Sequence, residues 1–202
     1  MSYQVDNLFP TAVYVADDVK IDCDNLRDQA INLDPSLWAH EKEHHFYVSD
    51  NHVLGEYSNK YVRGVILAHA EQYIVDVLHY DIPDQCHLDV SDSWFTNTTE
   101  ISQVEWHTHT HAFICGILCL DTIGQTHFRN RYKPYKFWNF NAKQDNPYTT
   151  SIYTIPSIKG RLMLWEADLH HRLTTDQQRY SLAFNIMPRG QISDANTAKL
   201  TL

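Results

Sequence analysis

Residues 104–121 read VEWHTHTHAFICGILCLD and carry the strongest structural signal in the chain. The first half alternates, so a strand period of two places His107, His109 and His111 on one face and the tryptophan and threonines between them on the other. An apolar run continues the pattern in the second half. We therefore predict a strand here, with closely spaced imidazoles on one face.

Strand-like segments separated by turn residues surround this block. They are HLDVSDSWFTN (87–97), QTHFRN (125–130), TSIYTI (150–155), GRLMLWEA (160–167) and RYSLAFNIMP (179–188). The earlier part of the chain differs: after a β-rich opening at 8–19, apolar stripes at helical spacing predict helices over 22–32 and 55–80. Helices followed by a long all-β half predict an α+β fold, with the helices packed on one sheet of a β sandwich or barrel.

The chain shows no internal repeat, low-complexity segment or linker, and its 202 residues are enough to bury one hydrophobic core. We expect a single domain over 1–202. Its parts are an N-terminal strand and helices at 1–82 and a β core at 83–190, which includes an insert at 128–153.

Composition excludes several classes of function. The net charge of -9 argues against general nucleic-acid binding, which needs a basic surface. No apolar run approaches the roughly 20 residues that span a bilayer, and the first ten residues lack a signal-peptide pattern. The four cysteines are scattered, without a CxxC pair. We therefore expect no membrane partner and a location in a reducing cytoplasm, that of the host if the gene is carried by a phage.

The histidines of residues 104–121 predict a metal site. Two imidazoles on one strand face are close enough to chelate one ion, and imidazole suits Fe, Zn, Cu or Ni without choosing among them. A third ligand has to come from another strand, and LHHRL supplies His170 or His171. Farther on, Arg179 and Ser181 share a strand face, where a guanidinium and a hydroxyl suit a dicarboxylate.

The stretch at 128–153 combines five basic residues with eight aromatic ones and has no acid before Asp145. So long a loop in a compact domain is more often functional than filler. It is a candidate lid that contacts substrate through Tyr132, Tyr135 and Trp138. Base stacking, a structural insert and a homodimer contact remain alternatives.

Taken together, these motifs resemble the Fe(II)/2-oxoglutarate-dependent oxygenase superfamily, and more narrowly a group of bacterial and phage oxygenases with an HxH…H…R pattern. The resemblance spans nearly the whole chain and is weakest over 20–90 and 128–153. The resemblance rests on four blocks in order along the chain. They are an LFPTPV-like start at 8–13, a W…N strand, an HxHxxxxxSG block and a distal block at 156–185. The residues that match the second, third and fourth blocks are Trp94, Asn97, His107, His109, Cys115 (in place of serine), Gly116, Pro156, Gly160, Leu162, Leu164, Trp165, His171, Leu173, Arg179, Ser181, Phe184 and Asn185.

This resemblance implies a double-stranded β-helix (jelly roll) core. It also implies Fe(II) on His107, His109 and His171, 2-oxoglutarate on Arg179 and Ser181, and consumption of O2. Asn97, with Trp94, is expected in the wall of the 2-oxoglutarate pocket. The spacing from Gly160 favours His171 over His170, which then points away from the site. The implied reaction is hydroxylation of a protein, peptide or small molecule.

The sequence departs from the superfamily at one ligand. The common iron site has two histidines and one carboxylate, whereas the middle position here is His109. Asp121 and Asp168 are alternative carboxylates, and His111 is an alternative imidazole.

Two other functions stay open. Cupins also begin with HxH, but their following glutamate is replaced here by Phe113 or Ile114, and no histidine follows Gly160 at their spacing. A cupin-type metal protein would not use 2-oxoglutarate. A catalytically inactive jelly roll with a structural role would bind neither metal nor 2-oxoglutarate.

Overall fold

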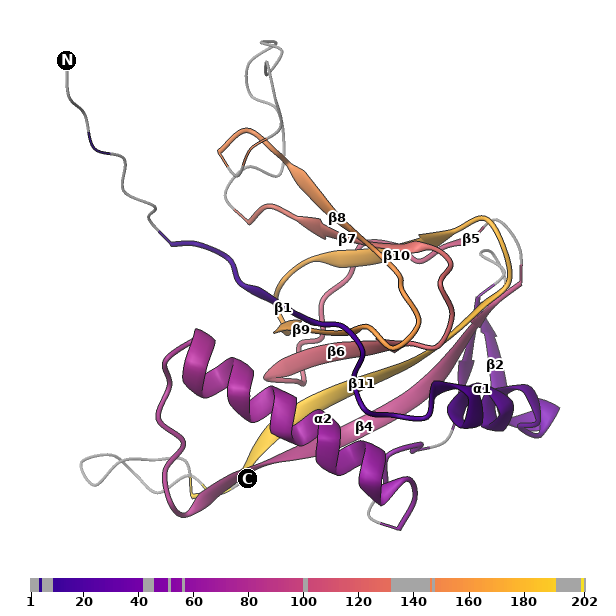
Figure 1. Ribbon diagram of the computed structural model, residues 1–202, viewed down its shortest axis with the longest axis horizontal. Coiled ribbons are helices and arrows are strands. Elements are labelled where there is room, and N and C mark those ends of the chain that lie inside the picture. The colour runs from indigo at the N-terminus through magenta and orange to yellow at the C-terminus, as the bar shows by residue number, and fades with distance from the viewer. Residues whose placement is uncertain are drawn as a thin grey trace.

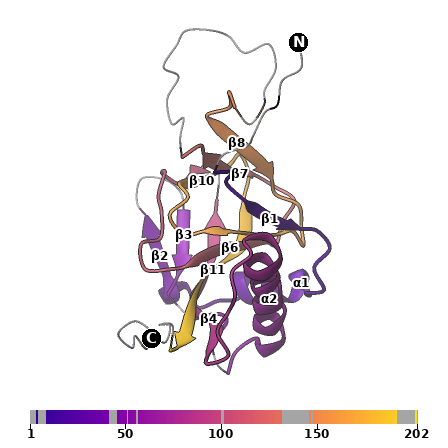
Figure 2. The same ribbon diagram turned by 90° about the vertical axis from the view of Figure 1, so that its left-hand side faces the viewer.

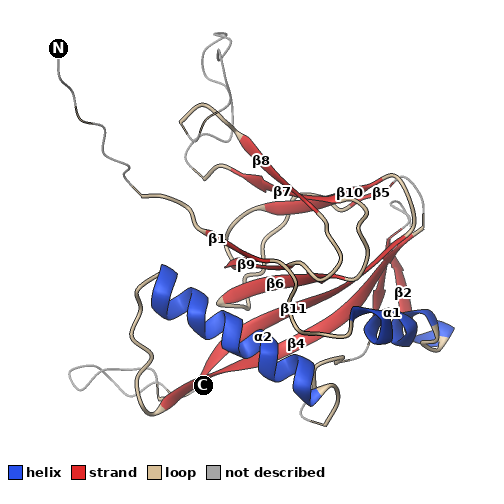
Figure 3. Ribbon diagram, in the orientation of Figure 1, coloured by secondary structure: helices blue, strands red, loops and turns tan. Residues whose placement is uncertain are grey.

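The computed structural model describes residues 4, 9–41, 46–50, 52–55, 57–99, 102–131, 146, 148–191 and 201. Within these residues the strands form two sheets that face each other, and the helices come from the N-terminal part of the chain (Figure 3). The predicted α+β class with a jelly-roll core is confirmed.

The larger sheet has seven strands in the order β1-β9-β6-β11-β4-β3-β2. Its strands are β1 (Val13–Ala16), β2 (Trp38–Glu41), β3 (Phe46–Ser49), β4 (Cys86–Thr98), β6 (Ile114–Cys119), β9 (Leu162–Glu166) and β11 (Arg179–Gly190). All pairings are antiparallel, and β11 lies at the centre between β6 and β4.

The smaller sheet has four strands in the order β5-β10-β7-β8. They are β5 (Ser102–Gln103), β7 (Gln125–Arg129), β8 (Ile152–Pro156) and β10 (His171–Thr175). This sheet lies across the larger one, above β6 and β9 in Figure 1. From β4 to β11 the chain passes back and forth between the two sheets, with only the β7–β8 hairpin staying within one of them, as in a jelly roll.

Alternation along β11 gives the larger sheet two different faces. Leu182, Phe184 and Ile186 are fully buried on the side of the helices. Arg179 and Ser181 are also buried but point between the two sheets, as their spacing of two predicted. The central strand therefore contributes to the core beneath the helices and to the site at the same time.

The helices cover the outer face of the larger sheet. They are α1 (Cys23–Ile31), α2 (Lys60–Gln72) and a π-helical turn (Tyr73–Val77) that continues α2. The side chain of Asp22 caps α1 by accepting a hydrogen bond from the Asn25 amide at 3.0 Å. Figures 1 and 2 show both helices on the side away from the four-stranded sheet.

A second apolar core fills the space between the sheets. Its buried members are Cys115, Ile117, Cys119, Phe128, Ile155, Met163, Trp165, Ala167, Leu169 and Leu173. Gly116 stands where a Cβ would collide with the Phe184 ring, so β6 can approach β11 only with glycine at this position.

Several sequence predictions need correction. Residues 104–121 do not form one strand: β6 begins only at Ile114, and the histidines lie in the loop before it. The second helix begins at Lys60 rather than 55. The β2–β3 hairpin was not predicted. None of the helices in the described part of the chain has the length and apolar character needed to cross a lipid bilayer.

Candidate metal centre

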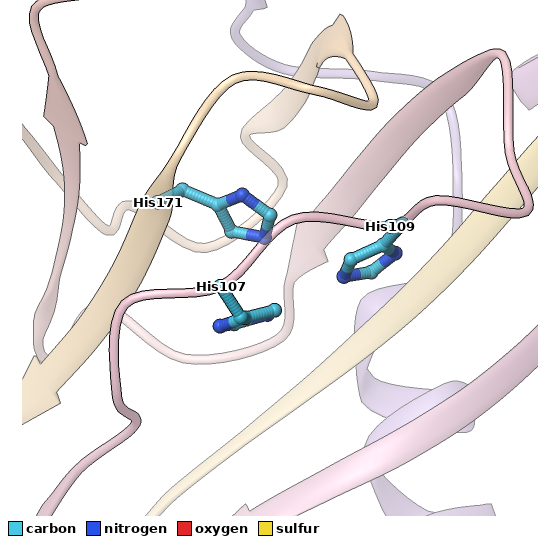
Figure 4. Close-up of side chains that lie close together, drawn as sticks. All are labelled: His107, His109 and His171. Atoms are coloured by element: carbon cyan, nitrogen blue, oxygen red, sulfur yellow. The ribbon is translucent and has the colours of Figure 1, made fainter.

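Backbone contacts bring the three predicted histidines together. The amide of His107 donates to the carbonyl oxygen of His171, and the amide of His171 to that of His107, both at 3.1 Å. The amide of His109 donates to the carbonyl oxygen of Ala167 at 2.9 Å. One ligand atom from each imidazole then lies within 4.8 Å of the other two (Figure 4). This spacing is short enough for one metal ion to contact all three.

Each of these imidazoles has its Nδ1 atom beside an oxygen. His107 Nδ1 lies 2.8 Å from the carbonyl oxygen of Glu105, and His171 Nδ1 lies 2.9 Å from that of Leu169. His109 Nδ1 lies 2.5 Å from the amide oxygen of Asn185. Because a carbonyl or amide oxygen only accepts, Nδ1 carries the hydrogen in all three rings. The lone pair of each Nε2 is therefore available to a metal.

A second contact at His171 does not change this tautomer. The indole N–H of Trp165 lies 3.3 Å from His171 Nδ1, farther than the Leu169 oxygen. A nitrogen that donates its hydrogen has no in-plane lone pair left to accept the indole N–H. The shorter contact therefore sets the tautomer, and the indole packs against the ring edge at a centroid distance of 4.8 Å.

Burial favours the neutral form of His109 and His171. Desolvation, with a smaller effect of His107, lowers the pKa of His171 to about 3. Desolvation also lowers the pKa of His109, although its hydrogen bond with Asn185 acts in the opposite direction. Neutral imidazole is the form that binds metals, so these two rings are ready to act as ligands at neutral pH.

A cavity of about 460 Å³ opens onto the histidines, within the size range of small-molecule sites. The aromatic and apolar part of its wall comes from both sheets: Phe46, Val48, Trp94, Ile117, Trp165, Leu173 and Ala183. Polar atoms come from the histidines, Thr96, Thr126 and Asn185. A substrate in this cavity would lie directly beside the three imidazoles.

Arg179 and Ser181 lie deeper between the sheets, on the strand face that includes Ala183 and Asn185. Ser181 Oγ is 2.5 Å from Oγ1 of Thr96, a residue of the cavity wall. Arg179 is 1% exposed, and its Nη2 contacts Cys119 Sγ at 3.8 Å. Its Nε and Nη1 have no hydrogen-bond partner among the described residues. A buried guanidinium with unused N–H groups is suited to bind a carboxylate.

Close packing leaves this arginine little freedom. A Cβ on Gly124, whose φ is +84°, would lie 3.3 Å from Arg179 Cδ and 2.8 Å from a backbone oxygen of Thr174. The lack of a side chain at this turn therefore makes room for the arginine. Desolvation lowers the pKa of Arg179 below its ordinary value, although Cys119 and Asp121 act in the opposite direction.

Other predicted site residues lie elsewhere. Asn97 does not line the cavity, because Trp94 and Thr96 point into it and Asn97 has the opposite parity on β4. Its amide oxygen instead accepts from Gln178 Nε2 at 3.5 Å. The predicted substrate contacts Tyr132, Tyr135 and Trp138 lie outside the described residues.

The three alternative ligands, Asp121, Asp168 and His111, make other contacts. Asp121 accepts hydrogen bonds from Arg27 Nε and the Tyr180 amide, both at 2.8 Å. Asp168 forms an ion pair with Arg131. His111, with a side chain 69% exposed, stacks at 6.2 Å from His109. None of the three belongs to the metal-sized cluster.

Two residues of the site were not predicted as such. Asn185 shares the inward parity of Arg179 and Ser181, and this spacing was the available signal. Asp92 carried no signal, because its contact with Asn185 joins residues 93 positions apart.

The segment that carries the site matches a known protein family in sequence. Residues 92–185 match the sequence model of a family described as "Putative 2OG-Fe(II) oxygenase", where 2OG denotes 2-oxoglutarate. The matched segment contains the three histidines, Arg179 and Ser181. No match was found among curated proteins.

Solved structures share the fold. The epimerase SnoN, in complex with Fe3+, alpha ketoglutarate and nogalamycin RO, has a TM-score of 0.60 at 13% identity, over 95% of this chain and 89% of SnoN. A Pseudomonas putida prolyl-4-hydroxylase has a TM-score of 0.57 at 11% identity, over 87% of this chain and 92% of the hydroxylase. HygX from Streptomyces hygroscopicus, with nickel and 2-oxoglutarate bound, has a TM-score of 0.54 at 14% identity, over 87% of this chain and 82% of HygX. At such identities the likeness establishes the fold alone.

The resemblance predicted from the sequence is confirmed for residues 92–185. The sequence match supports the expected enzyme class and cofactors, an oxygenase that uses iron, 2-oxoglutarate and O2. The assignment of individual residues to these cofactors stays a proposal.

Proposed function

We propose that the chain is a dioxygenase with Fe(II) bound to His107, His109 and His171. The premise is that residues 92–185 match the sequence model of a 2OG-Fe(II) oxygenase family. The observation that carries this proposal is the common tautomer of the three rings. Each Nδ1 hydrogen is already used by an oxygen, which leaves three Nε2 lone pairs within 4.8 Å of one another. Such a donor set fits a divalent transition metal.

The unsatisfied guanidinium supports binding of 2-oxoglutarate. The Nε and Nη1 atoms of Arg179 are buried without partners in the described part of the chain, and such atoms are costly unless a ligand supplies acceptors. A carboxylate of the 2-oxo acid would accept hydrogen bonds from them, and Ser181 Oγ would donate another. A cupin-type site has no need for this buried cation, so the arginine favours the oxygenase.

The proposed reaction is hydroxylation of a protein, peptide or small molecule. Bound Fe(II) supplies the oxidation of a C–H bond by O2, coupled to decarboxylation of 2-oxoglutarate to succinate. The residues of this chain bind and orient: the imidazoles hold the metal, Arg179 orients the co-substrate, and the wall formed by Trp94, Trp165 and their neighbours excludes water. Tyr132, Tyr135 and Trp138 remain the proposed substrate contacts.

The test is an anaerobic titration of the Fe(II)-loaded protein with 2-oxoglutarate, followed by the weak visible charge-transfer band of a chelated 2-oxo acid. We expect the band in the wild type, its loss in His171→Ala and its weakening in Arg179→Ala. Metal binding without the band would favour a cupin-type protein. Failure to bind any metal would contradict the ligand assignment and favour the structural jelly roll.

A further inference from the structure

A continuous chain of hydrogen bonds leads from His109 to a carboxylate. His109 Nδ1 lies 2.5 Å from Asn185 Oδ1. Asn185 Nδ2 in turn lies 3.0 and 3.1 Å from the two carboxylate oxygens of Asp92. Asn185 is fully buried, whereas the Asp92 side chain is 41% exposed. The chain of contacts therefore runs from the metal cluster to a partly exposed carboxylate.

The orientation of the Asn185 amide follows from chemistry. A carboxylate only accepts hydrogen bonds, so the group that faces Asp92 must be the NH2. The oxygen is then directed at His109, which must donate from Nδ1. His111 Nε2, at 3.3 Å from Asn185 Nδ2, is placed to accept the second amide hydrogen. Without Asp92 the described contact on that side would be His111, a ring nitrogen that can donate or accept according to its tautomer.

The backbone is built to place this pair. Asp92 and Asn185 are direct cross-strand partners in the pairing of β4 with β11. Immediately afterwards the register shifts, since Val90 pairs with Ile186 and Ser91 is the extra residue. A β-bulge redirects side chains and is common beside active sites. The irregularity therefore occurs directly beside Asp92.

His109 differs in this respect from the other two imidazoles. The acceptors for His107 and His171 are backbone carbonyl oxygens, whose direction the fold determines. The acceptor for His109 is a side-chain amide that could present either its oxygen or its nitrogen. If the nitrogen faced the ring, Nδ1 would have to accept and Nε2 would carry the hydrogen, which would block the metal.

We propose that Asp92 is a positioning residue of the metal site, acting through Asn185 to hold His109 with its Nε2 lone pair directed at the metal. This inference rests on the proposed function, because it takes His109 as a ligand. Partners outside the ligand shell orient ligating histidines and raise their basicity. A site with three neutral ligands thereby gains a carboxylate, two hydrogen bonds away from the metal.

Three variants of this chain of contacts test the proposal. Asp92→Ala removes the acceptor. Asp92→Asn keeps the size and shape of the side chain but replaces the carboxylate acceptor of the Asn185 amide with a neutral amide oxygen. The double variant Asp92→Asn with Asn185→Asp exchanges the two groups, so that a carboxylate accepts directly from His109. Asp168→Asn is the matched control, because it removes a nearby negative charge that contacts Arg131 instead of a histidine.

The first measurement uses metal-free protein, in which 15N NMR chemical shifts report the tautomer of His109. We expect Nδ1–H in the wild type, the control and the double variant, and a shift toward Nε2–H in Asp92→Ala. The second measurement is Co(II) affinity by chelator competition. We expect a loss of about 10–100-fold in Asp92→Ala, which is typical when such a partner is removed, and a smaller loss in Asp92→Asn. The double variant should bind at least as tightly as the wild type.

Unchanged tautomer and unchanged affinity in a folded Asp92→Ala protein would overturn the proposal. Failure of the double variant to recover affinity lost in Asp92→Asn would overturn it too, because the carboxylate would then matter only for local structure. An equal loss in Asp168→Asn would reduce the effect to general electrostatics and refute the specific chain of contacts. A wild type that binds no Co(II) would instead contradict the proposed function itself.

Discussion

Replacing Arg179 with methionine is expected to stabilise the free protein while abolishing its response to 2-oxoglutarate. The guanidinium is 1% exposed, and two of its nitrogens have no hydrogen-bond partner in the residues that the structure describes. Each unsatisfied buried group costs about 1–3 kcal/mol, so the two together cost about 2–6 kcal/mol in the free state. Apolar replacement of buried charged groups is accordingly neutral or stabilising by about 1–4 kcal/mol.

The co-substrate reverses this balance in the wild type. At a concentration about 100 times its Kd, a ligand stabilises the folded state by about 2.7 kcal/mol. Loss of a buried charged partner weakens binding by about 2–5 kcal/mol, so Arg179→Met should show almost no stabilisation at the same concentration. The assay is urea denaturation of both proteins with Co(II), in the presence and absence of 2-oxoglutarate.

Arg161→Met is the matched control. Arg161 Nε and Nη2 donate to Asp17 and its Nη1 donates to the Pro156 carbonyl oxygen, so all these groups are satisfied. The control should lose stability and keep the full response to 2-oxoglutarate. If Arg179→Met instead destabilised the free protein as the control does, the guanidinium would be satisfied without ligand, and the reasoning would be refuted.

Three further predictions concern the metal, pH and packing. His171→Ala should lose Co(II) binding, measured by competition with a chelator, whereas His170→Ala, with its side chain on the exposed side of the chain, should keep it. Burial lowers the pKa of His69, so the unfolded chain takes up a proton there first and stability is lost as pH falls below about 6.5. In urea denaturation at about pH 7.5 and 5.5, His69→Gln should reduce that loss, and an undiminished loss would contradict the assignment. Gly116→Ala should cost about 1–3 kcal/mol and lower Tm, because its Cβ would overlap the Phe184 ring. An unchanged Tm would show that the strands can move apart.

Regular alternation made the deep end of the site predictable. On β11 a period of two assigned Arg179 and Ser181 to one face and Tyr180, Leu182 and Phe184 to the other. Only the last three belong to the core beneath the helices, which agrees with this assignment. Likewise His171 is buried while His170 is exposed. Parity along one strand needs no knowledge of the partner strands, which explains why the sequence was sufficient for these predictions.

The same rule separates Asn97 from Trp94, which lines the cavity beside the histidines. Trp94 and Asn97 are three residues apart, so on a regular strand they cannot both face one cavity. The expectation for Asn97 came from the family motif, not from the alternation along the strand, and its place beside 2-oxoglutarate stays a prediction.

The loop before β6 was beyond sequence reasoning. His107 and His109 converge because one pairs with His171 and the other with the Ala167 carbonyl oxygen, about sixty residues farther along the chain. Alternation predicted the correct neighbours for the wrong reason. The sequence did not point to Asp92 for a similar reason, because its proposed role depends on a cross-strand pair and a β-bulge that join distant segments.

The reciprocal backbone bonds between His107 and His171 also bear on how the protein exchanges metal. These bonds join main-chain atoms of two of the three proposed ligands, so the pairing of their backbones does not depend on a metal. Release of the ion therefore does not require unfolding, and reloading does not require refolding, unlike in zinc fingers. A site that keeps its shape when empty accepts whichever fitting ion arrives first. The metal found in purified protein will thus report the metal supply during expression and purification as much as the preference of the ligands.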